Sequence, residues 1–145
     1  MEFYKSDYQT INFDESKSLL SKSWTPKSED LETDTFHNEI NKVVECAEKN
    51  NVKYILDDTR DFSFTITIEL QSWVDNEVFP RFIAAGLKKY AIIVSKEFIS
   101  QLSIEQTMEG EKGSQTFEVQ YFDNTEEARN WIENSISSAV TSDSL

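Results

Sequence analysis

Two short apolar runs constrain the fold of this 145-residue chain more than any other feature. Residues 52–56 and 90–94 are almost continuously apolar and rich in β-branched side chains. A strand with one wet face alternates apolar and polar residues, whereas a strand buried on both faces does not. The two runs therefore predict central strands of a parallel sheet that is covered by helices on both sides.

Helical periodicity marks the segments around these two strands. The first helix carries an apolar stripe with helical spacing, made of Phe36, Ile40, Val43, Val44 and Ala47. Ser28, Thr33 or Asp34 is a candidate cap at its start. The second helix spans residues 67–85, and Pro80 is expected to kink or restart it because proline lacks an N–H.

Two further helices follow in the sequence. Ser95 is a candidate cap for the third helix, with Phe98, Leu102 and Met108 expected to face inward. The last helix begins after Asn124, because a glutamate three residues further on resembles a capping box.

The remaining strands are expected at the two ends of the chain. Residues 2–14 and 17–24 read as an antiparallel hairpin, and the alternation in residues 116–122 indicates an edge strand with one wet face. The order is therefore β-β-α-β-α-β-α-β-α. The predicted class is α/β, with a mixed, mostly parallel sheet of four to five strands and flanking helices. We expect one domain over residues 1–136 and a flexible, serine-rich tail over 137–145.

Composition excludes several classes of function. The chain has 14 basic and 27 acidic residues and a net charge of −13, which disfavours nucleic acid and anionic membranes as partners. Its single cysteine, Cys46, rules out an internal disulfide and suits a reducing compartment. Neither a signal peptide nor a membrane-spanning run is apparent, so a cytoplasmic protein is expected. We find no motif for a cofactor, and we assign neither metal ligands nor catalytic residues.

Several pieces of sequence together resemble the SpoIIAA-like proteins of the STAS/SEC14 group, which are small bacterial α/β domains. These pieces are residues 55–60, 69–73, 85–91, 102–106 and 121–131. The resemblance implies a sheet flanked by helices and no established enzymatic activity. The regulatory branch of that group is phosphorylated on a serine at the start of the helix after the central strand. This chain lacks the Asp-Ser pair and the glycine of that motif, so Ser63, Thr65 and Thr67 are the hydroxyls that could stand in.

Acidic residues gather where α/β folds place their ligand sites, at the carboxyl end of the first central strand. Asp57, Asp58 and Asp61 could hold a hard cation such as Mg²⁺. The alternative is that Arg60 pairs with these acids in a solvated loop.

Three hypotheses about function follow. The first is a non-catalytic regulatory or protein-interaction domain, whose partner surface is drawn from Asp57, Asp58, Arg60, Asp61, Phe64 and Trp73. The second is a carrier of a small apolar ligand or lipid, as in the SEC14 relatives. The third is a metal-dependent enzyme or phosphoprotein built on the aspartates. A homodimer paired through an edge strand is an open alternative.

Overall fold

A single mixed sheet of six strands forms the centre of the fold, in the order β1-β2-β3-β4-β5-β6. The computed structural model describes residues 1–110 and 116–143, with side chains as far as residue 138. β1–β2 and β2–β3 are antiparallel, whereas β3–β4, β4–β5 and β5–β6 are parallel, which confirms the expected mixed α/β class. The strands are Glu2–Lys5, Gln9–Asp14, Leu19–Trp24, Tyr54–Asp58, Lys89–Ile93 and Glu118–Phe122.

The sheet has one strand more than the four to five expected, because residues 2–14 form two strands instead of one. A tight turn separates β1 from β2 at Ser6, whose Oγ accepts hydrogen bonds from the backbone N–H groups of Tyr8 and Gln9. Serine favours such turns because its hydroxyl can replace a backbone partner. β2 and β3 then form the expected hairpin, and β6 lies at the expected sheet edge.

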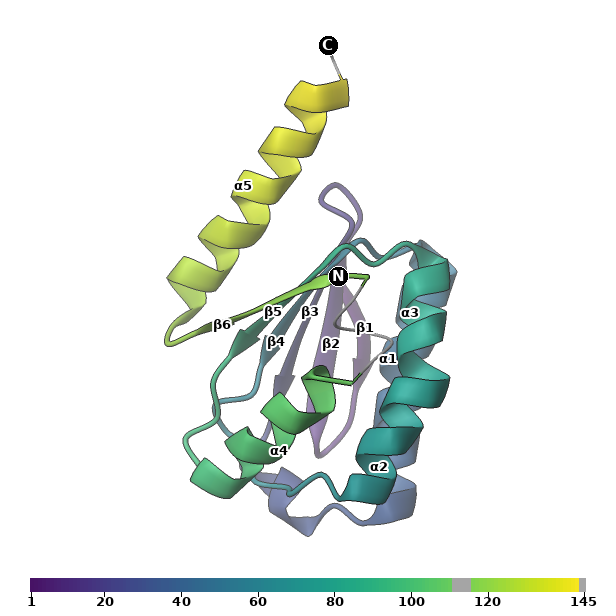
Figure 1. Ribbon diagram of the computed structural model, residues 1–145, viewed down its shortest axis with the longest axis vertical. Coiled ribbons are helices and arrows are strands. Elements are labelled where there is room, and N and C mark those ends of the chain that lie inside the picture. The colour runs from purple at the N-terminus through teal and green to yellow at the C-terminus, as the bar shows by residue number, and fades with distance from the viewer. Residues whose placement is uncertain (111–115, 144–145) are drawn as a thin grey trace.

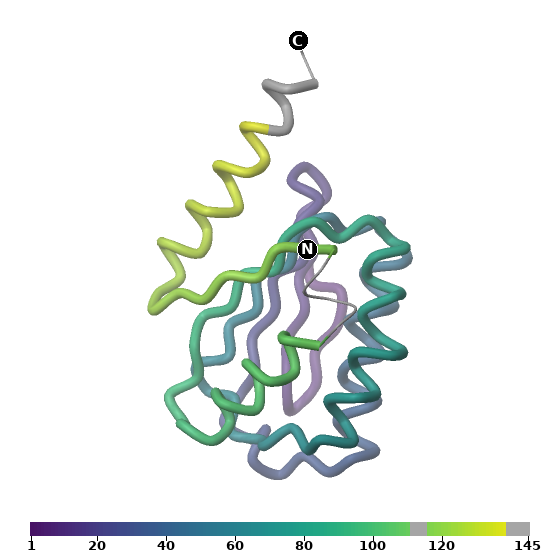
Figure 2. Tube along the Cα trace, viewed as in Figure 1, coloured from purple at the N-terminus to yellow at the C-terminus, as the bar shows by residue number. Residues whose placement is uncertain are grey.

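Helices cover the two faces of the sheet unequally (Figure 1). The larger core lies on the face covered by α1 (Thr33–Asn50), α3 (Phe79–Ala85) and α4 (Phe98–Met108). A smaller core lies on the opposite face, beneath α5 (Thr125–Asp143). Figure 2 shows α1 and α3 running side by side along one flank.

The start of α1 differs from the expectation. Its N-cap residue is Glu32, whose backbone N–H donates to Thr35 Oγ1 over 2.7 Å. Ser28 instead belongs to a 3₁₀ turn, Pro26–Asp30, and its Oγ accepts the N–H of Ser63. The serine is therefore used to fix a loop and does not cap the helix.

Pro80 lies at a restart within one continuous helical rod, as expected. The rod consists of α2 (Ile68–Trp73), a π-helical turn (Val74–Val78) and α3. Proline cannot donate to the carbonyl one turn earlier, and the wider turn before it accommodates the break. Gly86 ends the rod with φ of 110°, a conformation that glycine adopts without a side-chain clash.

The orientation of α4 contradicts the expectation for Phe98 and Leu102, which face solvent, and confirms it for Met108. The buried residues of the helix are Ser100, Ser103, Ile104, Thr107 and Met108. The cap is the Glu97 carboxylate, which accepts the N–H of Ser100 over 2.6 Å. Ser103 must face inward because its Oγ accepts the backbone N–H of Ile66 in the loop before α2.

Asn124 caps α5 as expected, since its Oδ1 accepts the N–H of Glu127 over 2.9 Å. The helix continues to Asp143 and extends beyond the rest of the molecule (Figure 1). Residues 137–143 of the expected tail belong to this helix, and residues 144 and 145 lie outside the described residues. That the segment 137–145 is flexible stays a prediction.

Candidate functional site

Asp57 and Asp58 end strand β4 and point to opposite faces of the sheet, as successive strand residues must. The side chain of Asp57 enters the larger core, where the residue is only 7% exposed. Asp58 lies on the other face and is half-buried. The strand continues two residues further than its apolar run, so Asp57 is a core residue and not part of a solvated loop.

A polar triad crosses three neighbouring strands at Asp57. Lys22 of β3 lies opposite Asp57 in the register of the parallel pair, and its Nζ donates to Asp57 Oδ1 over 3.1 Å. The hydroxyl of Tyr90, on β5, donates to Asp57 Oδ2 over 2.7 Å. Each carboxylate oxygen therefore has a donor, as a buried carboxylate requires.

Burial shifts the pKa values of both donors. The pKa of Lys22 is lowered by desolvation, although the charge of Asp57 and its hydrogen bond oppose that shift. The pKa of Tyr90 is raised well above its ordinary value by burial, and then by the neighbouring Asp57 carboxylate. Lys22 Nζ also lies 4.1 Å from the centroid of the Trp24 ring, which favours its charged form through the ring quadrupole.

A cavity of about 60 Å³ adjoins the triad inside the larger core. Most of its walls are apolar side chains from the sheet, α1, the rod and α4. Sequence reasoning did not single out Lys22 or Tyr90. The signal for Lys22 was its position between Leu20 and Trp24 on the inward side of an alternating strand.

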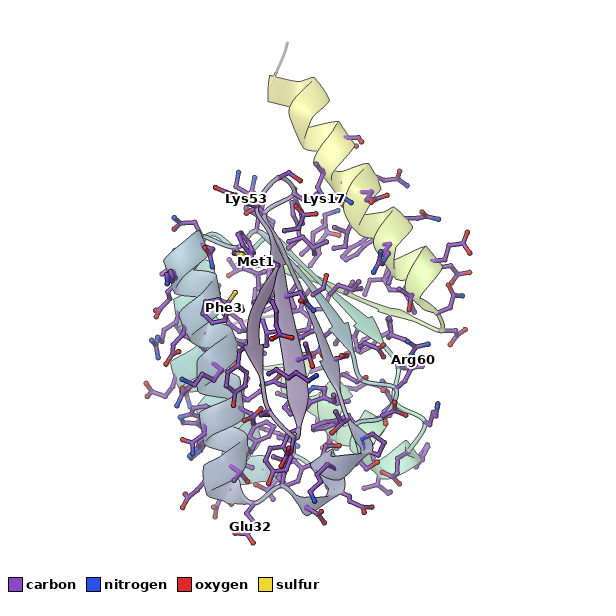
Figure 3. The ribbon with its side chains drawn as sticks, turned by 180° about the vertical axis from the view of Figure 1, so that it is seen from behind. Met1, Phe3, Lys17, Glu32, Lys53 and Arg60 are labelled. Carbon is purple, nitrogen blue, oxygen red and sulfur yellow. The ribbon has the colours of Figure 1, made fainter. Side chains whose placement is uncertain are left out.

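The two other aspartates pair with different cations on the surface. The Arg60 guanidinium binds Asp58 through two side-chain hydrogen bonds, of 3.0 and 2.6 Å. Asp61 lies 3.5 Å from Lys96 Nζ. Figure 3 shows Arg60 at the rim of the molecule. Arg60 therefore pairs with Asp58 and does not neutralise all three acids.

Asp57 and Asp58 point to opposite faces of the sheet, and each of the three aspartates is paired with a separate cation. The three carboxylates therefore do not converge on one point. Within the described residues, no group of three or more His, Cys, Asp or Glu side chains is placed to hold a metal ion. Cys46 is buried, and burial raises the pKa of its thiol. A raised pKa is the opposite of what a reactive thiolate needs.

Phe64 and Trp73 are both half-buried and pack against α1. Phe64 stacks on Phe36, with ring centroids 5.2 Å apart, and Trp73 lies 4.2 Å from the His37 ring. Thr67 caps α2 by accepting the N–H of Leu70. Thr65 and Thr67 are exposed and Ser63 is partly so.

A second feature is an exposed apolar surface on α2 and α4, which we call the α2–α4 surface. Its members are Ile68, Phe98, Ile99 and Leu102, which are 78%, 75%, 49% and 43% exposed. The two helices are joined by a hydrogen bond of 3.1 Å between the Gln71 and Gln106 side chains. Apart from Met1, every exposed large apolar side chain in the described part of the chain belongs to this surface.

Comparison with known families decides the identity of the fold. The model of the SpoIIAA-like family matches residues 24–133, which is most of the chain. The chain belongs to the SpoIIAA-like family. Searches of curated proteins and of solved structures gave no significant match.

The SpoIIAA-like domain is of the STAS type, which is generally regulatory or interaction-forming and generally non-catalytic. In this SpoIIAA-like chain the matched segment includes Asp57, Tyr90 and the α2–α4 surface. Lys22 lies outside it, on the hairpin that precedes the match. No helix in the described ranges is long and apolar enough to cross a membrane.

Proposed function

We propose that this domain is a non-catalytic protein-interaction domain that binds its partner on the α2–α4 surface. The observation that carries this proposal is the exposure of Phe98, Ile99 and Leu102 on a helix whose serines and threonines face the core. Contiguous exposed apolar side chains on a folded protein typically mark an interaction site. The arrangement exposes side chains that an ordinary amphipathic helix would bury.

Charge favours a protein partner with basic flanks. Carboxylates border the apolar side chains along the chain, because Glu69 follows Ile68, Glu97 precedes Phe98, and Glu105 lies one turn after Leu102. A segment with apolar residues at helical spacing and Lys or Arg at its ends would match this pattern. The same carboxylates, with the net charge of −13, disfavour an anionic lipid surface.

The carrier alternative has weaker support. The cavity inside the core measures about 60 Å³, whereas pockets for organic ligands begin at about 300 Å³. Two larger hollows of about 390 and about 350 Å³ are open grooves on the surface. A lipid-sized cargo would therefore require a different conformation.

Other assignments stay predictions. They are a cytoplasmic location, pairing of two copies through the β6 edge, and phosphorylation of Ser63, Thr65 or Thr67. Comparing the intact mass under native conditions with the denatured mass separates the last two. A doubled native mass reports a dimer, and a surplus of one phosphate in the denatured chain reports modification.

Peptide selection tests the proposed surface directly, because it does not require an identified partner. We expect a displayed random-peptide library to yield sequences with apolar residues every three to four positions and basic flanks. Fluorescence anisotropy of these peptides should show affinity reduced about tenfold or more by Phe98→Ser with Leu102→Ser. Asn38→Ser, an exposed change on α1, is the matched control and should change nothing.

Two results would contradict the proposal. One is equal binding of the selected peptides by the double variant and the wild type. The other is sedimentation with vesicles of phosphatidylcholine and phosphatidylglycerol that depends on Phe98, because that result would assign the surface to lipid.

A further inference from the structure

The cavity beside the polar triad has one polar end and an otherwise apolar wall. Lys22, Asp57 and Tyr90 border it on the sheet side, together with Thr59. Thr107 borders it from α4. The hydroxyls of both threonines donate to backbone carbonyls. Their donor capacity is therefore used within the fold.

Lys22 is the group with donors to spare. An ammonium has three N–H donors, and among the described residues Nζ makes one hydrogen bond, to Asp57. The Trp24 ring covers another side of the ammonium. The side chain of Lys22 is 1% exposed, so bulk water does not supply the missing acceptor. A buried donor without a partner costs free energy, and an acceptor placed in the cavity would remove that cost.

We propose that this cavity binds a small neutral molecule that offers Lys22 one hydrogen-bond acceptor on a short apolar body. A short-chain alcohol is the chemical class. An apolar cavity of about 150 Å³ accepts benzene, which has six non-hydrogen atoms, so a cavity of about 60 Å³ accepts about two to three. The proposal is independent of the function assigned to the α2–α4 surface.

The charges beside the cavity explain why the proposed ligand is neutral. Lys22 and Asp57 form a pair with no net charge, and Tyr90 keeps its proton because its pKa is raised. An anion or a cation would leave one uncompensated charge in a low-dielectric core. A neutral acceptor adds a hydrogen bond to the ammonium without that cost.

Water alone fills the cavity poorly. A buried water needs two to four polar partners, and these are gathered on the sheet side at Lys22, Asp57, Thr59 and Tyr90, with Thr107 as the polar group on α4. The far wall includes Phe79, Ile104 and Met108, which offer no hydrogen bond. An apolar body satisfies that wall by dispersion contacts, which water does not provide.

A paired titration tests the proposal on the full chain. Ethanol is the polar probe and xenon the apolar probe, each followed by ¹H–¹⁵N spectra. We expect saturable shifts at cavity-lining residues with both probes. Lys22→Met with Asp57→Asn should weaken ethanol binding about tenfold or more and leave xenon binding unchanged, because only the alcohol uses the ammonium. The amide oxygen introduced by Asp57→Asn would still accept a hydrogen bond from Tyr90, which helps the double variant fold.

A second variant keeps the test decisive if the first does not fold. Val78 is buried and lines the cavity, so Val78→Leu fills space without touching the triad and should block both probes. The proposal is overturned if ethanol gives no saturable shifts in the wild type. It is also overturned if Val78→Leu leaves ethanol binding intact, or if the triad variant binds ethanol as tightly as the wild type does.

Discussion

Two ion pairs on neighbouring residues of β4 have opposite geometry and burial. The surface pair of Asp58 and Arg60 is bidentate, with a shortest contact of 2.6 Å. The core pair of Asp57 and Lys22 has a single contact of 3.1 Å. Distance alone would rank the surface pair as the stronger one.

Solvent exposure reverses that ranking when the pairs are compared by the stability lost on mutating one partner. Water screens the surface pair and hydrates either partner when the other is lost. The core pair has no such replacement, so loss of one partner leaves an unpaired charge in an apolar surrounding. The comparison teaches that the cost of breaking an ion pair follows burial more closely than contact length.

The largest expected effect is at Lys22. Lys22→Met should lower the free energy of unfolding by about 3–5 kcal/mol, because it leaves Asp57 charged and buried. Urea unfolding at pH 7 measures this change. The matched control is Arg60→Met on the surface pair, which should cost at most about 1 kcal/mol.

An apolar replacement sharpens the same comparison. The triple variant Lys22→Met, Asp57→Leu and Tyr90→Phe removes every member of the triad together. It should recover most of the stability that Lys22→Met loses, because no charge or hydroxyl is then left unpaired. A triple variant as unstable as the single one would show that the triad is itself strongly stabilising, and that desolvation is not the decisive factor.

Tyr90→Phe has a smaller expected effect. The change removes one of the two donors to Asp57 and leaves the salt bridge, so about 1–3 kcal/mol should be lost at pH 7. Urea unfolding again provides the measurement. A loss below about 0.5 kcal/mol would mean that Lys22 alone satisfies the carboxylate.

Alkaline pH should separate Tyr90 from Lys22. The folded-state pKa of Tyr90 is raised, so its contribution is complete below the unfolded value of about 10 and is lost as pH rises above it. The lowered pKa of Lys22 acts in the opposite direction below about 10.4. Above pH 10, we therefore expect stability to fall less steeply in Tyr90→Phe than in the wild type, by up to about 1.4 kcal/mol per pH unit.

Tyr121 provides an internal reference for this measurement. Burial, followed by the charges of Glu105 and Glu109, raises the pKa of Tyr121 to about 12. Its contribution remains in Tyr90→Phe, so the variant should retain a residual alkaline loss. Identical pH dependence of both proteins would contradict the assignment of the raised pKa to Tyr90.

The sequence predicted the fold well where periodicity carries the information. Continuous apolar runs identified β4 and β5, and helical spacing identified α1, because core burial imposes those patterns directly. The count of strands failed at Ser6, because a turn made by one hydroxyl leaves little trace in hydrophobicity.

The candidate site was predicted less completely. The apolar run ends at residue 56, but pairing with Ser23 and Ile93 continues the strand through Asp58. The pairing partners come from distant segments, so local pattern does not show that Asp57 turns inward. The orientation of α4 was missed for a related reason, because Ser103 faces inward to bond a distant loop.

The smallest expected effect is at Asp58. Partial burial alone would raise its pKa, but hydrogen bonds from the Arg60 side chain and backbone outweigh burial and leave the pKa below its ordinary value. The stability from this pair is therefore present above the unfolded pKa of about 3.9 and is lost as pH falls toward the folded value.

Asp58→Asn should cost less than about 1 kcal/mol at pH 7 and still less in high salt, and the difference from the wild type should vanish in acid. Urea unfolding from strongly acidic to neutral pH measures it. A cost for Asp58→Asn as large as that for Lys22→Met would break the comparison, because it would place the surface carboxylate in an environment as poorly hydrated as the core.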